Sequence, residues 1–130
     1  MNILFICKYN RFRSKVAEAL FNYYNKNKNF HVKSAGIRVD PLNPKVAKIV
    51  IELLKKQNIK ISDINSHKFN KKLIAWADKI IIVADNVPSN EFPKEKTEIW
   101  PIPDAEESDI QETKNSIKLI KLNIKKLIYK

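Results

Sequence analysis

This chain of 130 residues contains very few of the residues that make tight turns or cross-links, with one glycine and one cysteine. A single cysteine cannot form a disulfide within the chain, so we expect the protein to work in a reducing compartment, the cytoplasm. One cysteine and two well-separated histidines are too few for a structural zinc site. We therefore predict neither a metal nor another cofactor.

Long hydrophobic runs are also missing. No apolar run approaches the length that spans a bilayer, and the N-terminus lacks the basic-then-apolar pattern of a signal peptide. The composition, 44% hydrophobic and 30% charged, is that of a globular protein rather than a disordered one. No repeat or linker divides the chain, and its length is sufficient to bury a core. We predict one domain over residues 1–130 and no membrane association.

Negative charge is scarce, because 14 Asp and Glu face 25 Lys and Arg, which gives a formal net charge of +11. Such a surface attracts anions, among them phosphorylated substrates, inorganic phosphate and nucleic acid. The lysines are scattered along the whole chain instead of being gathered in one stretch. This distribution favours a solvated surface over a dedicated nucleic-acid interface.

Buried-strand patterns alternate with helical patterns along the chain. This alternation predicts an α/β fold with a four-stranded parallel sheet, doubly wound, with helices on both faces and the working site at the carboxyl ends of the strands. The predicted strands are 2–6, 30–35, 79–83 and 98–100. The first predicted helix begins at Ser14, which is expected to be its N-cap. The other predicted helices run from Pro44 (with Asn43 as N-cap) to about Gln57, run from about Lys68 to Ala77, and begin at Ile110.

The loop from Cys7 to Ser14 lies between the first strand and the first helix. Backbone N–H groups and the positive end of the helix dipole converge at such a junction, which suits an anion. Cys7 stands at the mouth of the loop and Arg13 follows six residues later, a spacing that lets sulfur and guanidinium face the same oxyanion. The loop predicts a phosphoryl-transfer site with Cys7 as the nucleophile.

Three other features of this loop support that chemistry. Arg13 can hold two phosphate oxygens in a bidentate manner, which a lysine cannot do. Ser14 can donate a hydrogen bond to the sulfur and keep it ionised. Asn10 can hydrogen-bond to the loop backbone and tolerates a left-handed conformation.

A carboxylic acid is also needed to protonate the leaving oxygen. Asp104 is the best candidate, because it follows a strand and lies in a proline-stiffened loop at the expected edge of the sheet. The same carboxylate could then act as the base for the water that hydrolyses a phosphocysteine. Asp85 competes with Asp104 for this role, since it also closes a strand.

Less specific interpretations exist for each of these residues. A lone cysteine after an apolar strand is usually a small core residue, and short Cys-to-Arg-Ser spacings arise by chance. The combination of buried strand, loop, helix and a later Pro-Asp pair favours catalysis. His31 and His67 are expected to face solvent or cap backbone. Trp100 is expected in the core, although it lies close enough to Asp104 to touch a bound ligand.

These motifs make the chain similar to the low-molecular-weight protein tyrosine phosphatase family, which also includes thioredoxin-coupled arsenate reductases. The loop matches the family's Cys, Asn, Arg and Ser positions, Ser34-Ala35-Gly36 matches its Ser-Ala-Gly, and Pro103-Asp104 lies where its general acid is expected. The resemblance covers nearly the whole chain and implies that Cys7 is the nucleophile, with Arg13 and Asp104 completing the catalytic set. The residues it places around the phosphate are Lys8, Tyr9, Asn10, Arg11, Phe12, Arg13 and Ser14.

The chain departs from the family pattern at four places. Tyr9 stands where glycine is usual, Phe12 replaces a second cysteine that many relatives use for a protective disulfide, and Lys15 replaces a proline. Ala105-Glu106-Glu107 follows the expected acid, where the family commonly has proline and then tyrosines that flank a phosphotyrosine ring. The resemblance therefore does not define the substrate.

Three functional hypotheses remain open from the sequence. The first is a phosphatase that hydrolyses phosphate monoesters, with protein phosphotyrosine among them, through a phosphocysteine on Cys7. The second is an arsenate reductase that depends on an external thiol, because the chain has no further cysteine. The third is a binding module for phosphate or nucleic acid without turnover, in which Tyr9 blocks the loop.

Overall fold

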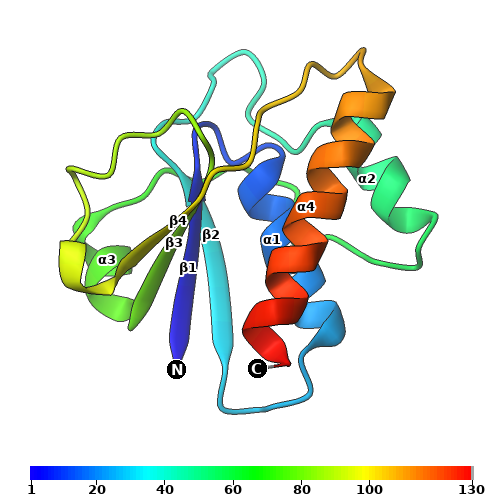
Figure 1. Cartoon of the computed structure of the whole chain (residues 1–130). Helices are drawn as coiled ribbons and strands as arrows, with labels where there is room; N and C mark the ends of the chain where they lie inside the picture. The colour runs from blue at the N-terminus through cyan, green and yellow to red at the C-terminus, as the bar shows by residue number, and fades with distance from the viewer. Residues whose placement is uncertain (130) are drawn as a thin grey trace.

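A four-stranded parallel sheet in the order β2-β1-β3-β4 forms the centre of the molecule (Figure 1). The computed structural model describes residues 1–129. β1 is an inner strand, and its residues from Ile3 to Cys7 are buried, as expected for a strand covered on both faces. The predicted parallel sheet is therefore confirmed. The strands are β1 (Asn2–Cys7), β2 (His31–Gly36), β3 (Lys79–Val83) and β4 (Thr97–Trp100).

Helices cover both faces of this sheet, as predicted. Successive side chains of β1 point to opposite faces, so Ile3 and Phe5 belong to one hydrophobic cluster and Leu4 and Ile6 to the other. The first cluster contains the buried faces of α1, α2 and α4, and α3 packs against the second. α1 and α4 lie side by side (Figure 1). The helices are α1 (Arg13–Tyr24), α2 (Lys48–Lys55), α3 (Lys71–Trp76), α4 (Ile110–Ile128) and the short 3₁₀ helix η1 (Lys94–Lys96).

The start of α1 differs from the prediction. Ser14 was expected to cap the helix, but the N-cap is Phe12, and no side chain makes a capping hydrogen bond there. The hydroxyl of Ser14 contacts the sulfur of Cys7 instead. The N-terminal N–H groups of α1 are thus left without a side-chain acceptor, which is the condition for anion binding at a helix start.

α2 is shorter than the predicted helix from Pro44 to Gln57. The segment before it is extended, because Lys45 bridges Asn65 in an antiparallel manner. The N–H of Ala47 donates to the carbonyl oxygen of Arg11 (3.2 Å), which ties the same segment to the loop. The local Asn-Pro signal for a helix start was therefore wrong, because pairing with distant segments fixes this backbone.

α3 is likewise shorter than the predicted helix from Lys68 to Ala77. Lys68 bridges Gly36, and the N–H of Phe69 donates to the carbonyl oxygen of Gly36 (3.0 Å), so the chain is still extended there. Asn70 then caps the helix, because its side chain accepts from the N–H of Leu73 (2.8 Å). None of the helices in the described part of the chain is long and apolar enough to cross a membrane.

Candidate active site

The carbonyl oxygens of the loop between β1 and α1 are bound by segments outside the loop. Within residues 1–129, no backbone N–H from Lys8 to Phe12 donates to another protein group. These N–H groups therefore remain for a ligand, and a set of them beside a helix N-terminus suits an oxyanion. The outside donors are Ile37 N to Cys7 O (3.0 Å), Arg38 N to Lys8 O (3.1 Å), Ser66 Oγ to Asn10 O (2.9 Å) and Ala47 N to Arg11 O (3.2 Å).

The only glycine of the chain allows this loop to approach β2. A Cβ atom added at Gly36 would lie 2.9 Å from the backbone N of Asn10 and 2.9 Å from the carbonyl carbon of Tyr9. Real Cβ atoms do not come so close to backbone, so a side chain at this position would push the loop away. Asn10 itself has a φ of 55° and takes the left-handed conformation that the sequence predicted.

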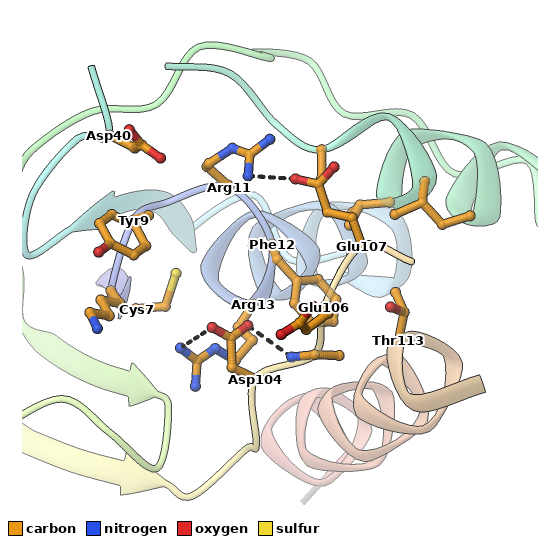
Figure 2. Close-up of a pocket in the computed structure, with 15 residues that line it drawn as sticks. Cys7, Tyr9, Arg11, Phe12, Arg13, Asp40, Asp104, Glu106, Glu107 and Thr113 are labelled. Atoms are coloured by element: carbon orange, nitrogen blue, oxygen red, sulfur yellow. Dashed lines mark hydrogen bonds and ion pairs between the residues drawn. The ribbon is translucent and has the colours of Figure 1, made fainter. Parts of the chain in front are cut away.

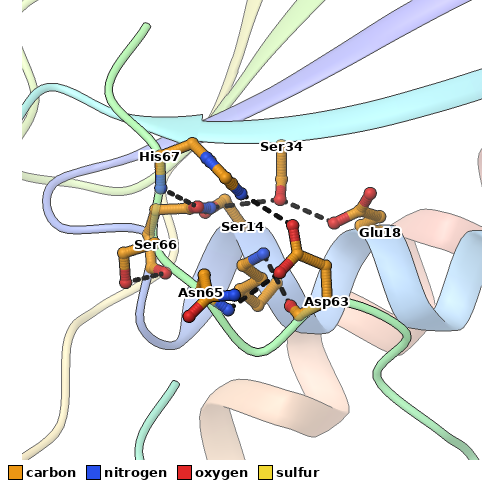
Figure 3. Close-up of polar contacts among 9 residues, drawn as sticks. Ser14, Glu18, Ser34, Asp63, Asn65, Ser66 and His67 are labelled. Atoms are coloured by element: carbon orange, nitrogen blue, oxygen red, sulfur yellow. Dashed lines mark hydrogen bonds and ion pairs between the residues drawn. The ribbon is translucent and has the colours of Figure 1, made fainter. Parts of the chain in front are cut away.

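A series of hydrogen bonds supports the sulfur from behind the loop. The Sγ of Cys7 lies 3.0 Å from the Oγ of Ser14, which accepts from Nδ2 of Asn10 at 2.7 Å. The same Nδ2 donates to the Oγ of Ser34 at 3.1 Å, and Ser34 donates to a carboxylate oxygen of Glu18 at 2.6 Å (Figure 3). The sequence did not reveal that Glu18 belongs to this hydrogen-bond network, because the sequence showed only that Glu18 lies early in a helix.

The orientation of Asn10 fixes the direction of these hydrogen bonds. Its Oδ1 accepts from the backbone N–H of His67 (2.9 Å), so its Nδ2 must face the two serine hydroxyls. Because the Ser14 oxygen accepts from Asn10, its own hydrogen is free for the sulfur of Cys7. The predicted contact between Ser14 and Cys7 is present, and a Ser14 hydroxyl that donates to the sulfur would stabilise the thiolate. The prediction that Asn10 would bond to the loop's own backbone was wrong, since its side chain bonds to two serine hydroxyls and to the backbone N–H of His67.

The segment around Asp63 and His67, behind the loop, carries a histidine and accepts a hydrogen bond from a buried lysine of α1. His67 is exposed, as predicted, and its Nε2 lies 2.6 Å from Oδ2 of Asp63. Hydrogen bonds from the N–H of Asn65 and from the ring of His67 hold the pKa of Asp63 below its ordinary value. Lys15 is only 1% exposed, and its Nζ donates to the carbonyl oxygen of Asp63 (2.8 Å). The residue that replaces the family's proline thus ties α1 to this segment.

Arg13 is almost completely buried at 1% exposure. Its Nη1 donates to the carbonyl oxygen of Ile102 (2.9 Å), and its Nη2 donates to Oδ1 of Asn86 (3.0 Å). The carboxylates of Asp85 and Asp104 lie 3.5 and 3.6 Å from its guanidinium nitrogens. Its Nε is buried without a partner. A buried N–H of this kind needs an acceptor, and an oxyanion in the loop would supply one. No pattern in the sequence pointed to Asn86.

The cysteine, the buried arginine and one of its two carboxylate neighbours meet at a pocket of about 480 Å³ (Figure 2). Cys7, Arg13 and Asp104 all line it, as the sequence predicted, whereas the competing Asp85 does not. Trp100 does not line it either, because its ring packs on Phe5 in the core with 5.9 Å between centroids. The expectation that Trp100 could touch a ligand was therefore wrong. The remaining lining residues are Lys8, Tyr9, Arg11, Phe12, Asp40, Ala47, Ile49, Val50, Ala105, Glu106, Glu107 and Thr113.

Tyr9 and Arg11 form parts of the pocket wall. The Nζ of Lys8 lies 5.3 Å from the ring centroid of Tyr9, and this pair lines the pocket together with Cys7. Nε of Arg11 donates to the carbonyl oxygen of Lys45 (2.8 Å), and its Nη1 lies 2.6 Å from a carboxylate oxygen of Glu107. The side chain of Arg11 thus links three loops around the pocket, a role that the sequence did not reveal.

The fold and the site define an α/β protein in which the loop after the first strand carries a cysteine and free backbone N–H groups. Residues 2–130 match the family described as low molecular weight phosphotyrosine protein phosphatase. The chain belongs to this family of cysteine-dependent phosphatases, which confirms the resemblance found in the sequence.

Solved structures of other proteins are similar over almost the whole chain. The low molecular weight protein tyrosine phosphatase from T. tengcongensis is 26% identical with a TM-score of 0.86, covering 99% of this chain and 98% of that one. An arsenate reductase from Archaeoglobus fulgidus is 26% identical with a TM-score of 0.80, covering 98% and 99%. The YwlE arginine phosphatase from Geobacillus stearothermophilus shares the fold at 23% identity and a TM-score of 0.84, covering 98% and 90%. No curated protein matches the chain.

Proposed function

We propose that this protein hydrolyses phosphate monoesters through a phosphocysteine on Cys7. The observation that carries the proposal is that Cys7, Arg13 and Asp104 line one pocket, while the Nε–H of Arg13 is buried without an acceptor. The substrate is a phosphorylated small molecule or phosphoprotein, and inorganic phosphate is the product. A single catalytic thiol requires a reducing compartment, so we place the reaction in the cytoplasm.

In the first step the Cys7 thiolate attacks phosphorus, and the bond between phosphorus and the leaving oxygen breaks. The free N–H groups of the loop and the Arg13 guanidinium hold the phosphoryl oxygens as this group becomes trigonal. Asp104 gives its proton to the leaving oxygen, which departs as an alcohol or phenol. The hydroxyl of Ser14 stabilises the sulfur both as thiolate and as leaving group in the next step.

In the second step water attacks the phosphocysteine. Asp104, now a carboxylate, takes a proton from this water while the phosphorus–sulfur bond breaks. Inorganic phosphate leaves, and the Cys7 thiolate is restored. The loop and Arg13 bind the same phosphoryl oxygens in both steps, so one set of hydrogen-bond donors stabilises both transition states.

The apolar side of the pocket, next to the phosphate-binding loop, favours an aromatic leaving group. Phe12, Ala47, Ile49 and Val50 give the pocket an apolar side next to the polar residues around Cys7. An aryl ring can bury its faces against such a wall while its phosphate reaches the loop. Phenolic esters, of which phosphotyrosine is one, therefore suit the pocket better than phosphates of short polar alcohols.

The test is hydrolysis of para-nitrophenyl phosphate by the wild type, Cys7→Ser, Arg13→Ala and Asp104→Asn. The first two variants should lose essentially all activity. Asp104→Asn should lose less, because para-nitrophenolate leaves without protonation. Full activity of Cys7→Ser would end the proposal. Salt-sensitive phosphate binding by a folded wild type without turnover would favour a binding module instead.

A second candidate is the reduction of arsenate, favoured by the likeness to the A. fulgidus arsenate reductase. Arsenate would take the place of phosphate in the loop, and two external thiols would be oxidised to a disulfide as arsenate becomes arsenite. The external thiols are required because Cys7 is the only cysteine of the chain. Arsenate-dependent consumption of a thiol donor would support this activity, and its absence beside phosphatase activity would remove it.

A further inference from the structure

The side chain of Arg11 is held in place on one side of the pocket. Its Nε donates to the carbonyl oxygen of Lys45 at 2.8 Å, and Lys45 is itself bridged to Asn65. The side chain of Arg11 is 22% exposed, whereas that of its ion-pair partner Glu107 is 54% exposed. Arg11 is thus the fixed member of this pair, and Glu107 is the member that solvent surrounds.

The Arg11–Glu107 pair is separate from the groups that serve the phosphate. Arg13 and Asp104 form their own pair beside Cys7, and Figure 2 shows the two pairs apart from each other around the pocket. Since Arg11 lines the same pocket as Cys7, a bound phosphate ester can meet both arginines.

We propose, on the basis of the function proposed above, that Arg11 is a second anion-binding group and selects phosphate esters whose leaving group carries a carboxylate or a second phosphate. Glu107 occupies Arg11 until such a substrate displaces it. The pair is open to solvent on its Glu107 side, where water can replace the ion pair, so the exchange costs little. The guanidinium fork matches carboxylate and phosphate oxygens, and the net charge of +11 draws anions towards the protein.

The carboxylates around the pocket make the opposite preference, for a cationic leaving group, the natural competitor. Asp40 is already committed, because its oxygens accept from the N–H of Leu42 (3.0 Å) and from Nδ2 of Asn43 (3.2 Å). Glu107 is held by Arg11. Asp104 pairs with Arg13, so of the pocket carboxylates only the side chain of Glu106 makes no hydrogen bond or ion pair within residues 1–129. The anchored Arg11 is therefore the selecting group.

The kinetic test compares phenyl phosphate with its 3-carboxy, 4-carboxy and 4-aminomethyl derivatives. The quantity of interest is kcat/KM for each charged substrate divided by that for phenyl phosphate in the same variant, so general effects on the loop cancel. Arg11→Gln should lower this ratio about tenfold for at least one carboxy isomer. Arg11→Lys should lower the ratio less than Arg11→Gln does, and Glu107→Gln should raise the ratio above that of the wild type. Lys60→Gln, which removes an exposed cation outside the pocket lining, should leave this ratio unchanged.

A binding test separates failure of this inference from failure of the phosphatase proposal. Calorimetry of benzylphosphonate and its carboxy derivatives needs no turnover, and the carboxylate should improve Kd in wild type but not in Arg11→Gln. A protein that binds in this way without hydrolysing esters would keep the inference and refute the phosphatase. Comparing kcat/KM for phosphotyrosine peptides with acidic and with neutral neighbouring residues shows where the second anion comes from. A preference for acidic peptides that depends on Arg11 indicates a protein substrate, and the lack of one indicates a small molecule. Equal ratios in wild type and Arg11→Gln, or preference for the aminomethyl ester, would overturn the inference.

Discussion

The hydroxyl of Ser14 lies 3.0 Å from the sulfur of Cys7 and takes its own hydrogen bond from Asn10 at 2.7 Å. Because Asn10 can only donate through that nitrogen, Ser14 has its hydrogen available for the sulfur. A charge-assisted hydrogen bond of this kind stabilises the thiolate more than the thiol. The polar network behind the loop therefore acts on the reactive atom itself.

Ser14→Ala should slow the reaction of Cys7 with iodoacetamide at neutral pH by about tenfold, since a hydrogen bond to a charged group is lost. Because Cys7 is the only cysteine, the rate can be followed by mass spectrometry of the whole protein. Ser62→Ala, at an exposed serine outside the pocket, is the matched control. Equal alkylation rates in wild type and Ser14→Ala would show that the hydroxyl does not act on the sulfur.

The two carboxylates beside Arg13 should have different kinetic roles. Asp104 lines the pocket with Cys7 and Asp85 does not, although both lie within 3.6 Å of the guanidinium. Asp104→Asn should reduce kcat on phenyl phosphate by about a hundredfold or more, because phenolate needs protonation. Asp85→Asn, the matched control for loss of charge beside Arg13, should cost much less. A larger loss in Asp85→Asn would assign the acid to the other carboxylate.

Replacement of Gly36 should displace the loop between β1 and α1 while the protein still folds. The new Cβ of Gly36→Ala meets backbone of Tyr9 and Asn10 at 2.9 Å, so the loop must move. We expect weaker inhibition by inorganic phosphate and a loss of about 1–3 kcal/mol in unfolding free energy, with Gly36→Ser worse than Gly36→Ala. Unchanged phosphate inhibition in a folded Gly36→Ala protein would contradict the close approach of loop and strand.

The unfolding free energy of the protein should depend on pH in the acidic range through the carboxylate of Asp63. Its folded pKa lies below the ordinary 3.8, so its contribution is present above that value and is lost as pH falls through the folded pKa. Asp63→Asn should lower the unfolding free energy at pH 5 by at most about 1 kcal/mol, because the side chain is half exposed, and the difference should shrink towards pH 3. Glu91→Gln, at an exposed position, is the control in urea titrations. A pH-independent difference for Asp63→Asn would exclude this linkage.

The sequence predicted the sheet because buried parallel strands have a strong signature. The apolar run of β3 and the run that ends at Cys7 have no polar side to present to solvent, so only a central position suits them. The helix caps predicted at Ser14 and Asn43 were wrong because other contacts took their place. The hydroxyl of Ser14 contacts the Cys7 sulfur within the same loop, and Lys45 pairs with the distant Asn65.

The candidate site was predictable where its residues lie in one loop and only partly where they do not. The spacing of Cys7 and Arg13 lies within eight residues of sequence, so the pattern could be seen directly. Asn86 and Glu107 reach their arginine partners only through the fold, across long separations in the chain. No local periodicity encodes such contacts, and only the packed strands and loops bring them together.

The most direct test of the account is whether the phosphoryl group passes through Cys7. Rapid acid quench during turnover of para-nitrophenyl phosphate, followed by mass spectrometry of the intact and digested protein, should find one phosphoryl group on the peptide that contains Cys7. Inorganic phosphate should appear only after this species has formed. Steady hydrolysis by the wild type with Cys7 never modified, or by a Cys7→Ser protein at the same rate, would contradict the account.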